Sequence, residues 1–321
     1  MKFAGPLIAL AGLALAVWLV WHADLQAVLG LMRAAGAGLV LAGIAHVLPM
    51  IASARDWQLL MRGTIQPKLI AVLGLVWIRE SVNGMLPVAR VGGEVVTFRM
   101  MHAWGMEPPA VLASFIVDIQ LTLISQALFA GASLAWLLGS GAVHLPPILT
   151  WGIAASAPTL VVLSLVLRAN PFRRLSKHFN RIASGKVAEL VDESEQVEDR
   201  VNALWHRRGI VTRYLLIWQS LQCITTALEV WLALYFLGAK TGFVQALVIE
   251  SLVQALSSIA FFVPGAVGVQ EGGFLLIGTA LGLNPQTCIA LAFARRIRDL
   301  VVFLPGLVAW QVVEWRHAQR S

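Results

Sequence analysis

The chain has 321 residues, of which 58% are hydrophobic and only 13% are charged. Soluble domains carry roughly 25% charged residues, so a chain this poor in charge could not cover a water-facing surface. The net charge of +7 does not indicate nucleic-acid binding, because the basic residues gather in loops between apolar stretches, as the positive-inside rule requires. We therefore expect an all-α, polytopic transmembrane helical bundle, a single integral membrane domain over residues 1–321, with no nucleic-acid partner.

Six apolar stretches are long enough to cross a bilayer as helices, which takes about 20 residues. They cover about 3–21, 35–53, 110–137, 146–167, 214–237 and 286–311. The first also resembles a cleavable signal segment, but further spans follow it and we expect it to remain as a helix. Two more apolar regions, about 69–104 and 242–283, are broken by Pro, Gly and charge.

Polar segments set the expected orientation. Residues 168–213 hold ten Lys or Arg and six Asp or Glu, and their middle, 189–200, has the pattern of an exposed amphipathic helix. We expect this loop, the basic segment 55–68 and both termini on the cytoplasmic side, and the uncharged stretch 139–145 on the other side. Each broken region must then enter and leave on one face, and the two must do so from opposite faces.

The broken regions also carry an internal repeat. When Pro87 is aligned with Pro264, an offset of 177 residues, Glu94 falls on Glu271. The same offset matches two turn positions and three alanines: Gly105 with Gly282, Pro108 with Pro285, Ala89 with Ala266, Ala103 with Ala280 and Ala113 with Ala290. Inverted repeats with broken helices near the midplane are a recurring plan of transporters. We expect an inverted repeat, about 35–167 and 214–311, with two broken or re-entrant helical hairpins.

Charged residues within the spans indicate a polar interior. The last span carries Arg295, Arg296, Arg298 and Asp299, each costing roughly 2.5–3.5 kcal/mol at a helix centre. Each of its eleven Leu, Ile, Val and Phe residues favours membrane insertion by only roughly 0.3–0.6 kcal/mol. Three more helices carry polar stripes: Ser114, Asp118, Thr122 and Ser125; Gln219, Gln222, Thr226 and Glu229; and Glu250, Gln254 and Ser257. We expect these faces to enclose one central hydrophilic cavity.

Two alternatives remain for these charges. They could form salt bridges that only fix helix packing. The true span could also be 272–294, which would leave Arg295 at its basic end. That second alternative leaves only about 300–312 for the final helix, which is short for a bilayer of about 30 Å.

The two hairpins supply further candidates. The first carries Arg79, Glu80 and Asn83, followed by a Pro- and Gly-containing turn with Arg90 and Glu94. Arg90 and Arg99 suit a phosphate or carboxylate, because Arg pairs bidentately with planar anions. We predict a substrate-binding or transport site made of Glu80, Asn83, Arg90, Glu94, Arg99, Asp118, Pro264, Glu271, Arg295, Arg298 and Asp299.

No metal-binding or nucleophilic constellation is evident, so we expect no catalytic residue, metal or cofactor. His46 and His102 are isolated and are interpreted as packing residues. Cys223 and Cys288 lie in apolar stretches without metal-type spacing. The alternative is a membrane-embedded lipid head-group enzyme, with Glu80, Glu94, His102 and Asp118 as its candidate acids and bases.

These motifs resemble a known family. A Pro-x-x-Arg-x-Gly-Gly-Glu turn, a Pro-Gly-x-x-Gly-x-x-Glu turn, and Arg-Arg-x-Arg-Asp followed by Leu-Pro-Gly resemble the flippase-like membrane region of lysylphosphatidylglycerol synthases. The detail is most similar to the hopanoid-biosynthesis-associated branch of bacterial proteins. The resemblance covers nearly the whole chain and implies lipid translocation in a bacterial inner membrane. It points to Arg90, Glu94, Arg99, Pro264, Glu271 and Arg295 as functional residues.

The chain also departs from that family. The bifunctional synthases carry a soluble aminoacyl-transfer domain after the membrane region, whereas here ten residues follow Gln311, and we expect no such activity. The first turn is two residues longer than the commoner Pro-x-Arg-x-Gly-Glu form, which leaves the role of Arg90 open.

The leading hypothesis is a lipid flippase for hopanoid-related or aminoacylated lipids. No ATP-binding motif is present, so transport would be passive, ion-coupled or driven by a partner, and Asp118 and Glu271 are candidates for a proton relay. The alternative outside transport is a membrane partner in envelope-lipid or hopanoid biosynthesis. A homo-oligomer or a complex with lipid-biosynthesis proteins is compatible with both hypotheses.

Overall fold

The computed structural model describes residues 24–61, 66–86, 92–140, 158–165, 186–260 and 266–318, together with Ala14, Trp18, Trp21, Ala154, Ala155 and Val263. All regular secondary structure in these ranges is helical. Three of the described helices are long and apolar enough to cross a membrane: Ala37–Leu60, Pro108–Gly139 and Arg208–Phe236. The predicted spans 3–21 and 146–167 lie largely outside the described residues.

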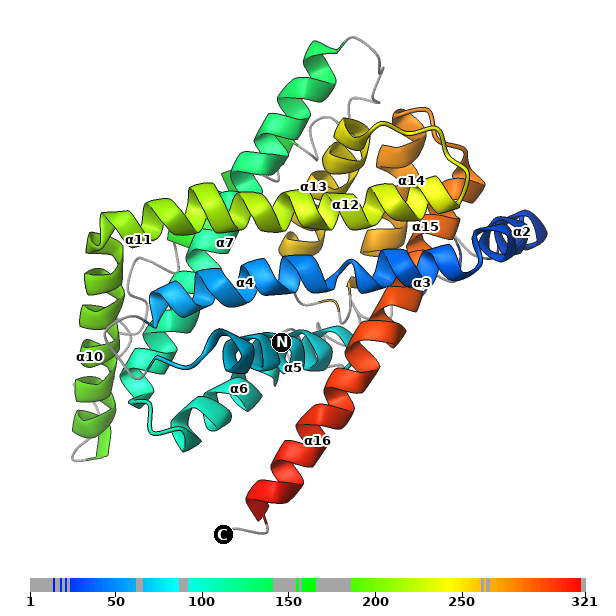
Figure 1. The fold of residues 1–321 in the computed structure, drawn as a ribbon. Coiled ribbons are helices and arrows are strands. Elements are labelled where there is room, and N and C mark those ends of the chain that lie inside the picture. Colours follow the sequence, from blue (N-terminus) through cyan, green and yellow to red (C-terminus); the bar gives the residue numbers. More distant parts are fainter. Residues whose placement is uncertain are drawn as a thin grey trace.

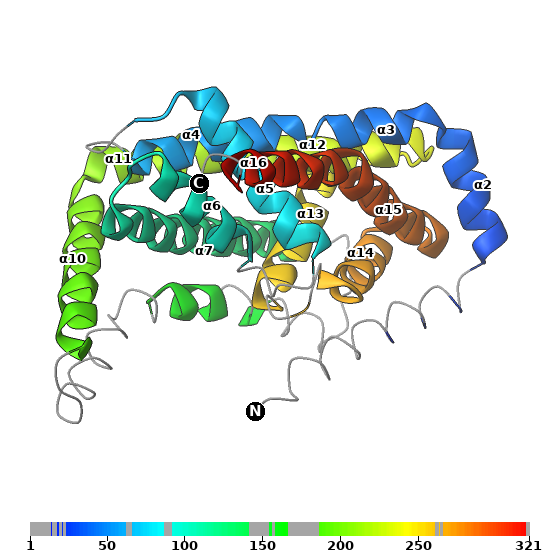
Figure 2. The ribbon, with the colours of Figure 1, turned by 90° about the horizontal axis from the view of Figure 1, so that it is seen from below.

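The helices before the long polar loop are α2 (Leu25–Ala35), α3 (Ala37–Ile44), α4 (Val47–Leu60), α5 (Leu69–Met85), α6 (Gly92–Ala103) and α7 (Pro108–Gly139). After it come α10 (Lys186–His206), α11 (Arg208–Arg213), the π-helical turn η1 (Tyr214–Gln219) and α12 (Ser220–Phe236). The chain then forms α13 (Phe243–Ile259), α14 (Val269–Ala280), α15 (Pro285–Arg298), the π-helical turn η3 (Asp299–Phe303) and α16 (Leu304–Ala318). Helices α3–α4 and α12 lie side by side as two long rods, and α7 crosses them (Figures 1 and 2).

The last predicted span, about 286–311, contains more charged residues than any other predicted span. Residues 285–318 run from α15 through η3 into α16, so the charged segment Arg295–Asp299 lies in the middle of this helical stretch. The preceding helix α14 ends at Ala280, where Gly282 adopts a φ of 87° that favours glycine. A continuous helix over 272–294 is therefore excluded, and with it the interpretation of Arg295 as the basic end of that span.

Element bounds repeat at the offset of 177 residues. Helix α6 plus 177 gives residues 269–280, which are the bounds of α14, and α7 and α15 both begin at a matched proline. Gly105 and Gly282 both have positive φ, of 83° and 87°, and each closes its helix. The backbone N–H of Met106 donates to Met101 O, and that of Leu283 donates to Gly278 O, again at matching positions. The turns that follow α6 and α14 therefore share a glycine with positive φ and the same backbone hydrogen bond.

The helix contacts repeat as well. In the first half, α5 contacts α4 and α6, and α6 contacts α7; in the second half, α13 contacts α12 and α14, and α14 contacts α15. The two halves also contact each other, because α13 packs on α7 and α5 packs on η3 and α16. Each hairpin thus lies against the long helix of the other half.

The polar loop contributes a longer helix than predicted. The expected helix over 189–200 is part of α10, which stands beside the end of α7 (Figures 1 and 2). Trp205 Nε1 donates to Gln120 Oε1 at 2.7 Å, and Arg200 forms an ion pair with Glu107. This part of the loop is docked on the helical bundle.

The hairpin α5–α6 depends on a close approach that only glycine permits. A Cβ added at Gly93 would lie 2.4 Å from the backbone oxygen of Arg79. Asn83 completes the contact, because its Oδ1 accepts from the backbone N–H of Gly93 at 2.8 Å. The two helices are therefore joined at the start of α6.

We predict that Gly93→Ala lowers stability by about 1–3 kcal/mol, the usual cost of overpacking, because the Arg79 backbone must move. Thermal unfolding of the purified protein in detergent measures the effect. The matched control is Gly74→Ala in α5, where nothing lies within 4 Å of the added Cβ. We expect that control to be neutral or more stable by up to about 1 kcal/mol. Equal melting temperatures for the two variants would contradict the close approach.

Candidate functional site

A cavity of about 570 Å³ lies between the two halves of the molecule. Four arginines and five carboxylates line it, from helices that are distant in the sequence. Its charged lining consists of His46, Arg79, Glu80, Glu94, Asp118, Glu250, Arg295, Arg296, Arg298 and Asp299. Polar stripe residues Thr122, Gln222, Thr226 and Gln254 line it too. The predicted central hydrophilic cavity thus has a counterpart within the described residues.

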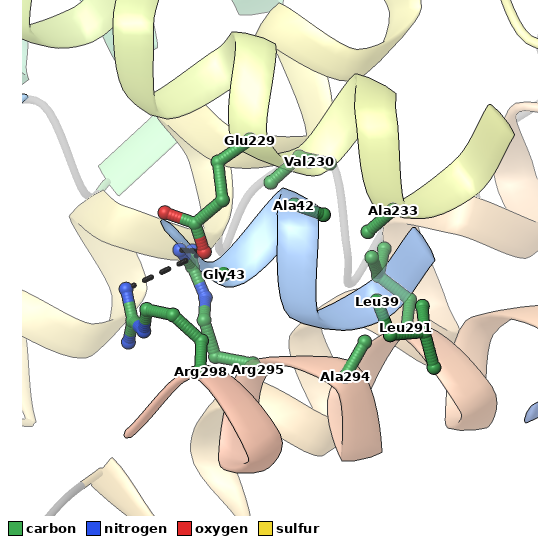
Figure 3. Close-up of a pocket in the computed structure, with 10 residues that line it drawn as sticks. All are labelled: Leu39, Ala42, Gly43, Glu229, Val230, Ala233, Leu291, Ala294, Arg295 and Arg298. Atoms are coloured by element: carbon green, nitrogen blue, oxygen red, sulfur yellow. Dashed lines mark hydrogen bonds and ion pairs between the residues drawn. The ribbon is translucent and has the colours of Figure 1, made fainter. Parts of the chain in front are cut away.

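The most deeply buried of the cavity arginines is Arg295 of α15, whose side chain is 6% exposed. Its Nη1 lies 3.2 Å from Glu229 Oε1 of α12, and its Nη2 forms an ion pair with Glu250 of α13. Because a buried charge without a partner is costly, these contacts tie three helices together. Figure 3 shows Glu229 pointing toward the arginines of α15 beside Gly43 of α3.

Arg298 extends this cluster by one helical turn. Its Nε donates to Asp299 Oδ1 at 2.9 Å, and its Nη1 lies 3.5 Å from Glu229 Oε1. His46 closes the cluster from the start of α4, with its Nδ1 2.6 Å from Glu229 Oε2 and its Nε2 3.4 Å from Glu80 Oε2. His46 is therefore buried, as expected of a packing residue, but it is part of the charged network, and the expectation that it is isolated was wrong.

Arg296 points to a different helix from Arg295. Its guanidinium contacts Glu271 Oε1 at 2.6 Å and Asp299 Oδ2 at 3.4 Å. The other oxygen of Glu271 accepts from the backbone N–H of Gly268 at 2.7 Å, at the start of α14. A carboxylate in the first turn of a helix is favourable because it opposes the helix dipole. Glu271 therefore fixes α14 to α15 and does not itself line the cavity.

A second polar cluster lies where α4, α5, α7 and η1 meet. Arg79 Nη1 is 2.9 Å from Asp118 Oδ2, and the guanidinium stacks over Trp57 at 4.6 Å from the ring centre. Tyr214 donates from its hydroxyl to Asp118 Oδ1 at 2.7 Å. Gln219 Nε2 donates to Asp56 Oδ2 at 2.7 Å. This cluster adjoins the cavity through Asp118 and Arg79.

Glu80 and Glu94 differ from the other cavity carboxylates in their partners. Glu94 accepts hydrogen bonds from Asn83 Nδ2 at 3.0 and 3.2 Å, and Glu80 has the long contact with His46. Among the described residues, neither carboxylate has an arginine or lysine nitrogen within 4 Å. Both therefore present a carboxyl group to the cavity that has no direct contact with an arginine or lysine among the described residues.

Most of the predicted site residues gather in one place. Seven line the cavity: Glu80, Asn83, Glu94, Asp118, Arg295, Arg298 and Asp299. Glu271 lies behind Arg296, as described above. Arg99 lies apart, exposed, in an ion pair with Glu314 at 3.2 Å. Arg90 and Pro264 fall outside the described residues.

Several cavity or network residues were not predicted as site members. They are His46, Asp56, Arg79, Tyr214, Glu229, Glu250 and Arg296. Glu229 and Glu250 belong to polar stripes that the sequence shows, and Arg79 and Arg296 are adjacent in sequence to predicted residues. The sequence pattern therefore already indicated these four residues. The second expected packing residue, His102, is exposed on α6 and stacks with Phe98 at 6.3 Å.

Neither histidine nor cysteine supplies a metal site among the described residues, where no group of three or more His, Cys, Asp or Glu could hold an ion. Cys223 and Cys288 are both free. The buried ion pairs fix neighbouring helices, and several of the same residues line the cavity. Salt bridges that fix helix packing and a hydrophilic cavity therefore occur together.

Comparison with known proteins places the chain in a family. Residues 5–306 match the family described as the lysylphosphatidylglycerol synthase TM region. The chain belongs to this family. It is also 22% identical to a UPF0104 membrane protein of Pyrococcus horikoshii, in an alignment 312 positions long that covers 91% of each chain. No solved structure matches the chain. The protein is thus a membrane protein of this family, and the regular structure of its described residues is helical.

We predict that Glu229→Gln destabilises the protein by about 3–5 kcal/mol, because it leaves Arg295 and Arg298 buried without their shared partner. The readout is thermal unfolding in detergent. The control is Glu314→Gln, which makes the same change in the Arg99 ion pair at the surface, where such a pair contributes about 0–1 kcal/mol. Similar losses in the two variants would mean that the buried network does not hold the helices together.

Proposed function

We propose that this protein moves a lipid head group across the membrane through the central cavity. The observation that carries the proposal is the cavity of about 570 Å³ lined by four arginines and five carboxylates. Ligand sites of proteins typically measure about 300–1,000 Å³, so the space suits a head group while the acyl chains remain in the bilayer. Ionisable residues within membrane segments commonly mark a substrate or ion pathway.

The charge balance favours a head group with an amine. Directly behind the lining lie two more carboxylates, Glu229 and Glu271, so seven carboxylates surround four arginines among the described residues. Glu80 and Glu94 face the cavity without a direct arginine partner and could receive an ammonium group. An aminoacylated phospholipid fits this balance, and it is the lipid class that the family's description implies. A hopanoid-linked lipid is the second candidate, suggested by the sequence motifs alone.

The matched helix bounds and exchanged contacts support two inverted repeats with re-entrant hairpins, α5–α6 and α13–α14. In transporters of this plan, one repeat rocks against the other around a fixed midplane site. The proposed path follows the seam between the halves, where α7 carries Asp118 and α15 carries Arg295 at equivalent positions. The proposal places the protein in a bacterial inner membrane, with both termini on the cytoplasmic side.

The test is lipid translocation in proteoliposomes. Head-group-labelled lipids are supplied as an aminoacylated phospholipid, its unmodified parent and a hopanoid-linked lipid. We expect the native protein to move the aminoacylated lipid fastest. Glu94→Gln should slow it at least about tenfold, because one transition-state contact of about 1.4 kcal/mol corresponds to that factor. The amide at position 94 can still accept from Asn83, so folding should be retained.

The control for this experiment is again Glu314→Gln, which lies outside the cavity. Its rate should equal that of the native protein. Movement of no lipid by folded native protein would reject transport and favour the role of a membrane partner. Chemical conversion of the added lipid, detected by chromatography of the recovered lipid, would instead favour an enzyme.

A further inference from the structure

Asp56 of α4 has an unusual environment for a carboxylate. Its side chain is fully buried, with 0% exposed surface, next to the equally buried Trp57. One oxygen, Oδ2, accepts from Gln219 Nε2, but Oδ1 is buried without any hydrogen-bond partner in the structure. A buried charged oxygen without a partner carries a large desolvation cost. A proton on the carboxyl group would remove the charge and with it most of this cost.

A continuous polar network joins Asp56 to the cavity. Gln219 Nε2 contacts both Asp56 Oδ2 and, at 3.5 Å, the hydroxyl of Tyr214. Tyr214 in turn donates to Asp118 Oδ1, and Asp118 lines the cavity. Ser53, one turn before Asp56 on the same helix, also lines the cavity. Asp56 is therefore one helical turn from water-accessible space.

The charges around Asp56 do not balance if both aspartates are ionised. The titratable and charged groups that face it are Arg79 from α5, Asp118 from α7 and Tyr214 from η1. One guanidinium therefore serves two carboxylates, and its direct ion pair is with Asp118. When two carboxylates lie in one low-dielectric site, the negative charge of one disfavours ionisation of the other. One of the two therefore tends to keep its proton.

We infer that Asp56, which Gln219 and Tyr214 connect to Asp118, is a proton-binding site that adjoins the cavity. A proton from cavity water adds to Asp56 Oδ1, giving a neutral carboxyl group, and returns to cavity water when the group ionises. A proton fits better than a metal ion for two reasons. Arg79 already places a positive charge beside Asp118, and no metal-type group of ligands occurs among the described residues.

The role of this proton in transport rests on the proposed function. Loss of the proton adds one negative charge beside the cavity, which strengthens the hold on an ammonium head group. Uptake of the proton weakens that hold and releases the head group. The two cations therefore compete for the same negative charge, and the cycle exchanges a proton for a cationic lipid. Reciprocal coupling of this kind is required whenever two ligands bias one site.

The protonation itself is tested without any transport. Infrared spectroscopy of the purified protein in lipid detects the C=O stretch of a protonated carboxyl group. We expect such a band at neutral pH in the native protein, absent in Asp56→Asn and retained in Glu314→Gln. The asparagine keeps the acceptor for Gln219, so Asp56→Asn should melt at or above the native temperature. A native spectrum without a band that responds to Asp56→Asn would overturn the inference.

A transport experiment tests this inference separately from the proposed function. In proteoliposomes, an inward or outward pH gradient should change the native rate of aminoacylated-lipid movement by at least about tenfold. Asp56→Asn should still move lipid down its own gradient but lose the response to pH. Lipid movement indifferent to the gradient would overturn proton exchange and leave the proposed function intact. A band at Asp56 with no lipid movement would keep the proton site and reject the flippase.

Discussion

The fold depends on the requirement that charge buried among apolar helices be paired within the protein. Arg295 meets this requirement with Glu229 and Glu250, and Arg298 meets it with Glu229 and Asp299. Because Glu229 and Glu250 come from α12 and α13 while the arginines belong to α15, the ion pairs fix how these three helices are placed. The hydrocarbon core of a bilayer supplies neither water nor counter-ions, so separation of the helices would leave each charge unpaired.

Polar contacts also fix the second helix of each hairpin to a neighbouring helix. Asn83 joins the end of α5 to the start of α6 through Gly93 and Glu94, and Glu271 joins the start of α14 to Arg296. In both hairpins a glutamate in the first turn of the second helix satisfies a backbone or amide N–H group. The equivalent glutamates thus have a structural role. In the first half Glu94 also faces the cavity.

Much of this arrangement could be predicted from sequence because charge within an apolar span is conspicuous. Asp118 and Arg295 were found in this way, and the repeat of 177 residues located the turns at Gly105 and Gly282. Asp56 was missed because apolar sequence ends near residue 53 and the span was ended there, whereas α4 continues to Leu60. His46 was missed because its partners Glu80 and Glu229 are 34 and 183 residues away. Pairing over such distances is set by three-dimensional packing and leaves no local pattern.

The π-helical turn at Asp299–Phe303 has a consequence for how far the two halves can resemble each other. An α-helix advances about 100° per residue, and a π-turn takes in about one residue more than an α-turn. Helix α7 is regular where its counterpart contains this turn. Side chains after Phe303 are therefore rotated by about 100° relative to those at the same offset in α7. The extra carbonyl is occupied, since Trp77 Nε1 donates to Val302 O at 2.6 Å. Beyond this point a residue of α16 and the residue at the same offset in α7 face different directions, so the two helices have different neighbours although their starting points match.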